Sequence, residues 1–137
     1  MSRIARLKFL AESALKEVLP GFRFADSEES VGASKTPLVA LSSDAGTDFE
    51  TTDYGTIRGR TSLKVDVYLC LGRDLGIKTK EDTDTLQNKV RKSIVNDKDI
   101  CREYLKAWCS KIMAMDIPGE NNLRVLCHDF EVSWLDV

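Results

Sequence analysis

The chain has 137 residues, a length that predicts one domain, spanning residues 1–137, with its own hydrophobic core. Apolar residues make up 42% and charged residues 31%, the balance of an ordinary globular protein. With 20 basic and 22 acidic residues the formal net charge is -2, which argues against a nucleic-acid coat or a membrane-surface protein. No apolar run approaches the roughly 18 residues of a membrane span, and the first ten residues lack the order of a secretory signal.

The amino-terminal segment predicts an amphipathic helix. Apolar residues recur at three- and four-residue steps from Ser2 to Leu19, and Pro20-Gly21 ends the pattern. Arg3, Arg6 and Lys8 lie at the positive end of the helix dipole, which is locally unfavourable. These cations form either a solvated face or a contact with an acidic partner, and the solvated face is the simpler expectation.

The most unusual stretch is residues 42–60, which are polar, acidic in their first part and followed by two arginines. They come after a polar loop (25–36) and a short strand that opens at Pro37 and ends at Leu41. Connections this long are uncommon in a compact domain and tend to be functional. Residues 42–60 form either a disordered surface loop or an arm, such as a hairpin, that orders against a neighbouring subunit.

The rest of the chain alternates between strand and helix patterns. The clearest strand covers residues 61–71, and a helix with acids at its start follows from Asp82 to Val95. Asp99 is placed to cap a short helix that runs through Leu105. Two further strands, residues 107–115 and 123–135, close the chain; in the first, alternation puts Trp108 and Ile112 on one face.

This order of elements predicts an α+β fold: a small, mostly antiparallel four-stranded sheet with the two main helices packed on one face and an extended polar arm or hairpin. The other face of the sheet carries Asp66, Tyr68, Asp129 and Glu131. We expect that face to be solvated or to face another subunit.

The sequence carries no recognisable catalytic machinery, and we expect no catalytic residues, no cofactor and no metal site. The four cysteines, at 70, 101, 109 and 127, form no Cys-x-x-Cys pair and lie among apolar residues, where a reduced thiol acts as a small hydrophobe. Cys127 and His128 are adjacent on a strand, so their side chains diverge. His128 is therefore expected to be a core or interface histidine rather than a catalytic base.

The architecture resembles the tail terminator proteins of long-tailed bacteriophages, also described as minor tail or head–tail joining proteins. The resemblance covers nearly the whole chain and rests on the order of its elements. It is carried by the helix that ends at Leu19-Pro20, the strand that opens with Pro37-Leu38-Val39, the polar arm, the strand from Leu63 to Leu71, the helix around Asp84 to Val90, and the closing Phe130 to Trp134.

The resemblance implies a non-enzymatic virion protein that forms a homo-oligomeric ring, usually of six copies. Such a ring caps the tail tube and joins it to the neck, leaving a channel through which DNA passes without specific binding. The implied partners are the tail tube protein and the neck or connector proteins, with no membrane involved. The implied location is the tail or neck of the virion, assembled in the host cytoplasm.

A ring subunit presents different patches to its two neighbours, and an ordered arm suits that role. The interface residues expected in the arm are Asp44, Asp48, Glu50, Asp53, Arg58 and Arg60. Two alternatives stay open. One is a small metal-dependent nuclease or hydrolase that uses Asp66, Asp129 and Glu131. The other is a monomeric adaptor that binds a protein through one sheet edge.

Overall fold

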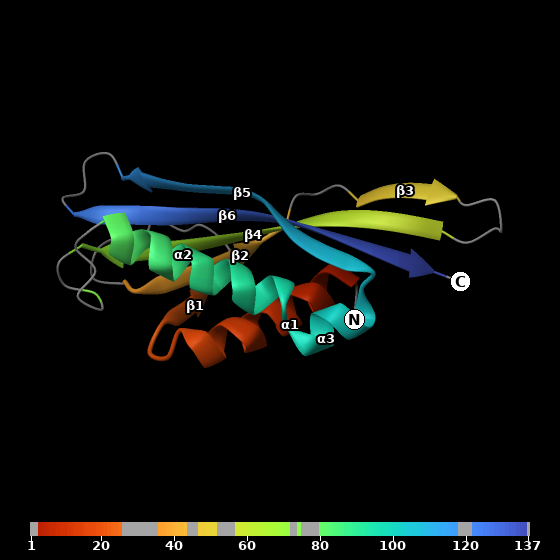
Figure 1. Cartoon of the computed structure of the whole chain (residues 1–137), viewed down its shortest axis with the longest axis horizontal. Coiled ribbons are helices and arrows are strands. Elements are labelled where there is room, and N and C mark those ends of the chain that lie inside the picture. Colours follow the sequence, from red (N-terminus) through yellow and green to blue (C-terminus); the bar gives the residue numbers. More distant parts are fainter. Residues whose placement is uncertain are drawn as a thin grey trace.

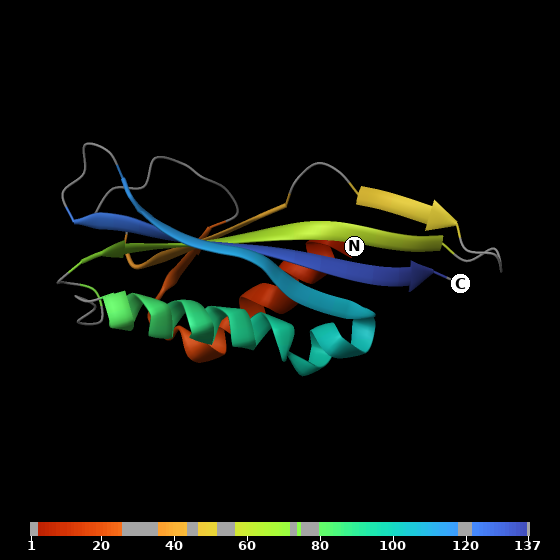
Figure 2. The ribbon, with the colours of Figure 1, turned by 45° about the horizontal axis from the view of Figure 1, so that its top comes forward.

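A computed structural model of the chain describes residues 3–25, 36–43, 47–51, 57–71, 74, 80–117 and 122–136. One six-stranded sheet is covered on one face by helices, and the two long helices lie beneath it (Figures 1 and 2). The helices are α1 (Arg3–Val18), α2 (Lys80–Val95) and α3 (Lys98–Glu103), and the strands are β1 (Arg23–Ala25), β2 (Leu38–Ser42), β3 (Thr47–Thr51), β4 (Ile57–Cys70), β5 (Lys106–Asp116) and β6 (Leu123–Asp136).

The strands follow the order β1-β2-β4-β6-β5, and β3 pairs with β4 beyond the end of β2. β1 runs parallel to β2, whereas the other pairs are antiparallel. The α+β class, the mostly antiparallel sheet and the two long helices on one face are confirmed. The expected count of four strands is wrong: β1 is too short to show an alternating pattern, and β3 lies in the arm, where a hairpin was one of two alternatives.

The main core lies between the sheet and the helices. It is built from the residues of β4 and β6 that face the helices, and from the apolar stripes of α1 and α2. Its members include Leu63, Val65, Val67, Leu69, Leu126, Phe130 and Val132 from the sheet and Leu7, Leu10, Leu15, Leu86, Val90 and Ile94 from the helices. Among the described residues no helix is long and apolar enough to cross a membrane.

The opposite face of the sheet is buried at one end within the chain itself, whereas the sequence predicted a face that is solvated or faces another subunit. Tyr68 and Asp66 are both buried, whereas Asp129 and Glu131 are half-buried. Tyr68 lies in register between Leu38 of β2 and Val125 of β6, and these three residues form a second, smaller apolar cluster together with Ala40. Cross-strand apolar neighbours bury the tyrosine ring, and a single strand's pattern does not reveal such neighbours.

A β-bulge in β5 corrects the predicted faces of that strand. The register shifts between Cys109 and Lys111, so that Trp108 lies opposite Glu131 and Ile112 lies opposite His128. Adjacent residues of β6 point to alternate faces of the sheet, so His128 and Glu131, which are three residues apart, point to opposite faces. Trp108 and Ile112 therefore point to opposite faces, although simple alternation puts them together.

The ends of the helices follow local chemistry. α1 ends just before Pro20-Gly21, where Gly21 adopts a φ of 82°, a conformation that favours glycine. The cap of α3 is Asp97, whose carboxylate accepts a hydrogen bond from the Ile100 backbone N–H at 3.1 Å. The expectation that Asp99 caps this helix is wrong by two residues, since Asp99 already lies in the first turn.

His128 is a core residue, which is one of the two alternatives predicted from the sequence. Its side chain is 0% exposed, and its Nδ1 lies 3.1 Å from the backbone oxygen of Val65, its register partner on β4. The ring stacks at 6.4 Å on Phe130, two residues along the same strand. Burial lowers the pKa of His128 below its ordinary value, because the charged imidazolium loses its hydration.

This burial predicts a pH dependence of stability. The unfolded chain binds a proton at His128 near pH 6.5, whereas the folded chain binds it only at lower pH. The free energy of unfolding is therefore highest above about pH 6.5 and falls as the pH decreases. We expect a slope of up to about 1.4 kcal/mol per pH unit below that point. In His128→Gln this slope is lost between pH 6.5 and 5, where the chain has no other histidine to titrate. Urea unfolding at stepped pH measures it, and an unchanged slope in the variant would contradict it.

Candidate assembly surfaces

The 42–60 segment contains a β-hairpin that extends past the helices. β3 pairs with the first residues of β4, and this end of the sheet lies beyond the part covered by α1 and α2 (Figure 1). In the hairpin register Asp48 lies opposite Arg60 and Glu50 lies opposite Arg58. Four of the six expected interface residues thus lie opposite one another in the backbone register of one chain. The other two, Asp44 and Asp53, lie outside the described residues.

Charge pairing continues across the same face of the sheet. The Nε of Arg60 lies 3.8 Å from the Oε2 of Glu131, a diagonal neighbour on β6. Further along, Asp129 lies in register between Lys64 on β4 and Lys111 on β5. Opposite charges therefore alternate from strand to strand over this face, which leaves it polar without a strong net charge.

The base of the hairpin is fixed by an aromatic contact. Gly59 lies opposite Trp134 in the β4–β6 register, and the indole covers the position that a Cβ would take at Gly59. The guanidinium of Arg3, from the first turn of α1, lies 4.1 Å from the centre of the same ring. Trp134 is buried between the hairpin and the amino terminus of α1, so it links these two distant segments.

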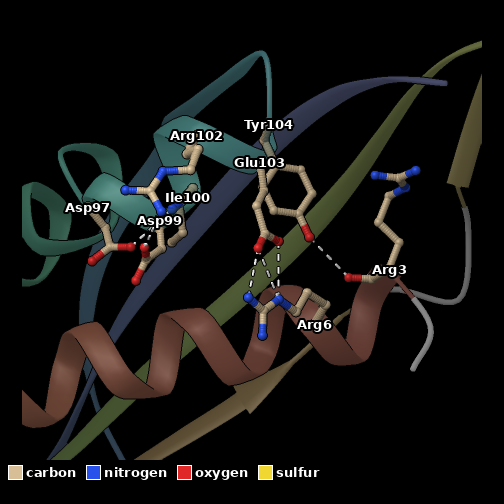
Figure 3. A network of polar contacts seen from close by, with 8 residues as sticks. All are labelled: Arg3, Arg6, Asp97, Asp99, Ile100, Arg102, Glu103 and Tyr104. Carbon is tan, nitrogen blue, oxygen red and sulfur yellow. Dashed lines mark hydrogen bonds and ion pairs between the residues drawn. The ribbon is translucent and has the colours of Figure 1, made fainter. Parts of the chain in front are cut away.

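The first turns of α1 also bind α3, as Figure 3 shows. Arg6 donates to both carboxylate oxygens of Glu103, with its Nη2 2.7 Å from Oε1 and its Nε 3.1 Å from Oε2. The Tyr104 hydroxyl donates to the backbone oxygen of Arg3 at 3.2 Å. The hydrogen bonds from Arg6 lower the pKa of Glu103, and burial raises the pKa of Tyr104. Arg6 thus keeps an exposed side chain, as the expectation of a solvated face has it, and its acidic partner lies within the same chain.

The outer edge of the sheet at β5 was missed by the sequence analysis. In the described part of the chain β5 pairs only with β6, and its second half is exposed on both faces. Ile112 and Met113 are each 38% exposed and Met115 is 45% exposed. Gln87 of α2 donates to the backbone oxygen of Met113 at 3.1 Å, which holds the strand against the helix layer. A long apolar edge strand is a template for pairing with another chain.

The acids of the nuclease alternative share one sheet face, but they do not converge. Asp66 lies opposite Cys127, whereas Asp129 lies between two lysines and Glu131 bonds to Arg60. No three His, Cys, Asp or Glu side chains among the described residues are grouped to hold a metal ion.

The four cysteines are free thiols, and Cys101 is exposed, which corrects the expectation that all four lie among apolar residues.

A shallow surface groove lies beside α2, between that helix and the end of α1. Its lining is apolar at Val18 and otherwise polar, with the side chains of Asn88, Lys89 and Lys92 along it. The hydroxyl residues Thr85 and Ser93 also line the groove, but Ser93 donates to the backbone oxygen of Val90, and the described residues of the lining include no His, Asp or Glu that could act as a base. The chemistry of the groove therefore favours no particular reaction.

Comparison with known proteins finds a structure of similar fold but no family. No protein-family model matches the sequence, and no curated protein matches it. A solved structure that shares the fold is a chain from the virion of a native gene transfer agent particle. The likeness has a TM-score of 0.58 at 10% sequence identity and covers 99% of this chain and 96% of that chain. At this identity the likeness establishes a shared fold over the full length of both chains.

The Trp134 contact predicts that Gly59→Ala destabilises the protein. A methyl group at residue 59 overlaps the indole, which must leave its buried position, and we expect a loss of about 1–3 kcal/mol in the free energy of unfolding. Arg58→Ala, an exposed neighbour on the same strand, is the matched control and should change stability by less than about 0.5 kcal/mol. Urea unfolding followed by tryptophan fluorescence measures both variants. Equal stability of the two variants would refute the contact.

The Arg6–Glu103 pair predicts a measurable coupling between α1 and α3. In a double-mutant cycle with Arg6→Ala and Glu103→Ala, we expect a favourable coupling that shrinks in roughly 1 M NaCl, because the pair is exposed to screening. The control is Arg102–Asp99, an exposed pair with one contact at 3.7 Å. The coupling energy of this control pair should be smaller, because it lacks the bidentate hydrogen bonding of Arg6 with Glu103. A larger coupling in the control pair would contradict the prediction.

Proposed function

We propose that the chain is a non-enzymatic structural protein of a virion, and that it forms a ring that caps the tail tube of a phage and joins it to the neck. One observation carries the proposal: the fold matches a chain of a virion particle from end to end, over 99% of this chain and 96% of that one. The order of elements, which resembles tail terminator proteins, supports the finer assignment to a ring at the end of the tail.

The surfaces of the sheet support an assembly function. Among the described strands, the outer ones at the two opposite edges of the sheet each have a neighbour on one side alone. A sheet with two such edges can make head-to-tail contacts, which close into a ring when the rotation between copies is right. The polar face carries alternating charges instead of a lysine stripe, and the chain is nearly neutral. A channel lined by such a surface does not grip phosphates, so DNA can slide through it.

The proposed complex is a homo-oligomer of about six copies, as the resemblance implies, with the tail tube protein on one side and neck or connector proteins on the other. DNA passes through the ring without sequence-specific binding. The protein belongs to the tail or neck of the particle and assembles in the host cytoplasm.

Ring formation tests the proposal directly. Size-exclusion chromatography with light scattering should give a mass of several subunits, and negative-stain images should show rings with a central hole. A chain that stays monomeric at high concentration would overturn the ring and favour the adaptor alternative. Turnover of DNA that depends on Mg²⁺ or Mn²⁺ and is lost in Asp66→Ala would overturn the non-enzymatic assignment.

Deletion of residues 44–58 tests the arm. We expect the shortened chain to lose the ring while it keeps its circular dichroism spectrum and cooperative unfolding, because the main core residues lie outside this segment. The matched control is Arg102→Ala in the full-length chain, an exposed arginine on α3 outside the arm, which should keep the ring mass. Rings formed by the deleted chain would show that the arm is not part of the interface.

A further inference from the structure

We propose that β3 of one copy adds as an antiparallel strand to the free edge of β5 in the next copy. This inference rests on the proposed ring and names the contact that builds it. The occupant of the β5 edge is thus a second copy of this chain, bound through its projecting hairpin.

The two strands lie on opposite outer edges of one sheet. Among the described strands β3 pairs only with β4, and β5 pairs only with β6. From Ile112 to Met115 the β5 edge carries no charge and no proline, the devices that natural proteins use to protect an edge from pairing. Each of these four residues is exposed, and within this stretch the backbone oxygen of Met113 accepts a hydrogen bond from Gln87 of α2.

The strand directions fit an antiparallel junction. β3, β4, β6 and β5 are successive antiparallel neighbours, so β3 runs opposite to β5 within one chain. Copies related by rotation about an axis near the strand direction keep their strand directions. A β3 strand that reaches the β5 edge of the next copy therefore meets it antiparallel, the arrangement that the rest of this part of the sheet already uses.

Charge and apolar character select a register. If Glu50 of one copy lies opposite Lys111 of the next, Phe49 comes opposite Ile112. An acid then faces a lysine and an aromatic residue faces an aliphatic one, both favourable cross-strand pairs. The alternative that puts Asp48 opposite Lys111 moves Phe49 toward the polar Ser110, at the bulge. A register shifted by one residue would instead turn the side chains of β3 to the opposite faces of the sheet, which separates Glu50 from Lys111.

The two edges also lie at opposite ends of the molecule. β3 is at the end where the hairpin projects, whereas the apolar part of β5 is at the other end, near the start of β6 (Figure 1). Successive copies joined in this way are staggered along the strands. A ring closes with such a stagger when the strands are tilted relative to the ring axis, as they are in a closed barrel, whereas untilted strands would give a helical filament.

Cysteine pairing tests the junction. In a chain whose four native cysteines are replaced by alanine, Phe49→Cys and Ile112→Cys are made singly and together. Opposite residues of antiparallel strands have Cα atoms about 4.5–5.5 Å apart, a separation that a disulfide can span. Under mild oxidation the double variant should give a ladder of covalent oligomers ending at the ring, and an equimolar mixture of the single variants should give covalent dimers. Phe49→Cys with Ala114→Cys, two residues off register, is the matched control and should give a much weaker ladder.

The other outcomes overturn the proposal in distinguishable ways. Dimers from Ile112→Cys alone would mean that β5 pairs with β5 of a second copy. Rings in negative stain without the 49–112 ladder would sink this junction and leave the proposed function standing. A cysteine-free chain that stays monomeric, when the parent chain also does, would sink both.

Blocking the edge gives a second measurement that needs no cysteine. Ile112→Lys places a charge in the apolar edge and should shift the light-scattering mass from ring to monomer. Phe9→Lys is the matched control, because Phe9 is 49% exposed on α1 and should leave the ring mass unchanged. Circular dichroism shows that both variants fold, and a ring that persists in folded Ile112→Lys would refute the proposal.

Discussion

The pairing of β4 with β6 is the contact on which the rest of the structure depends. The two strands run antiparallel in register from Ile57 opposite Asp136 to Cys70 opposite Leu123. One end of this ribbon is covered by α1 and α2 and buries the core, and the other end continues past the helices. A two-stranded ribbon is marginal in water by itself. The uncovered end is steadied by β3 on one side and by Trp134, which packs against Gly59 and Arg3.

The described strands of the arm extend the sheet beyond the core. The expected interface acids Asp48 and Glu50 lie opposite Arg60 and Arg58 in the β3–β4 register, so the backbone places residues of opposite charge side by side within one hairpin. Exposed ion pairs contribute little stability. In the proposed junction the contact between copies therefore depends on backbone pairing and apolar residues, with charge setting the register.

The sequence predicted the elements whose patterns are long and local. α1, α2, β4 and β6 each repeat their apolar residues over several turns or strand repeats, and the helix-facing row that includes His128 followed from alternation along β6. The wrong predictions concern features that depend on the neighbouring strands. Burial of Tyr68 depends on Leu38 and Val125 in other strands, and the β5 bulge shifts Trp108 to a face that alternation does not give. β1 has only three residues, and the open edge of β5 depends on the sheet order, which no residue pattern encodes.

The chemistry of the described residues favours assembly over catalysis. The acids on the polar face are held apart by lysines and arginines in register, whereas a hydrolytic site needs carboxylates that converge on one metal or one substrate atom. The single histidine is buried in the core and cannot reach a substrate. The exposed features are of another kind: an edge strand with an uncharged stretch from Ile112 to Met115, a hairpin at the far end of the sheet, and a polar face with alternating charges. In the proposed assembly the edge and the hairpin, at opposite ends of one sheet, are the two different patches that head-to-tail contacts between identical subunits require.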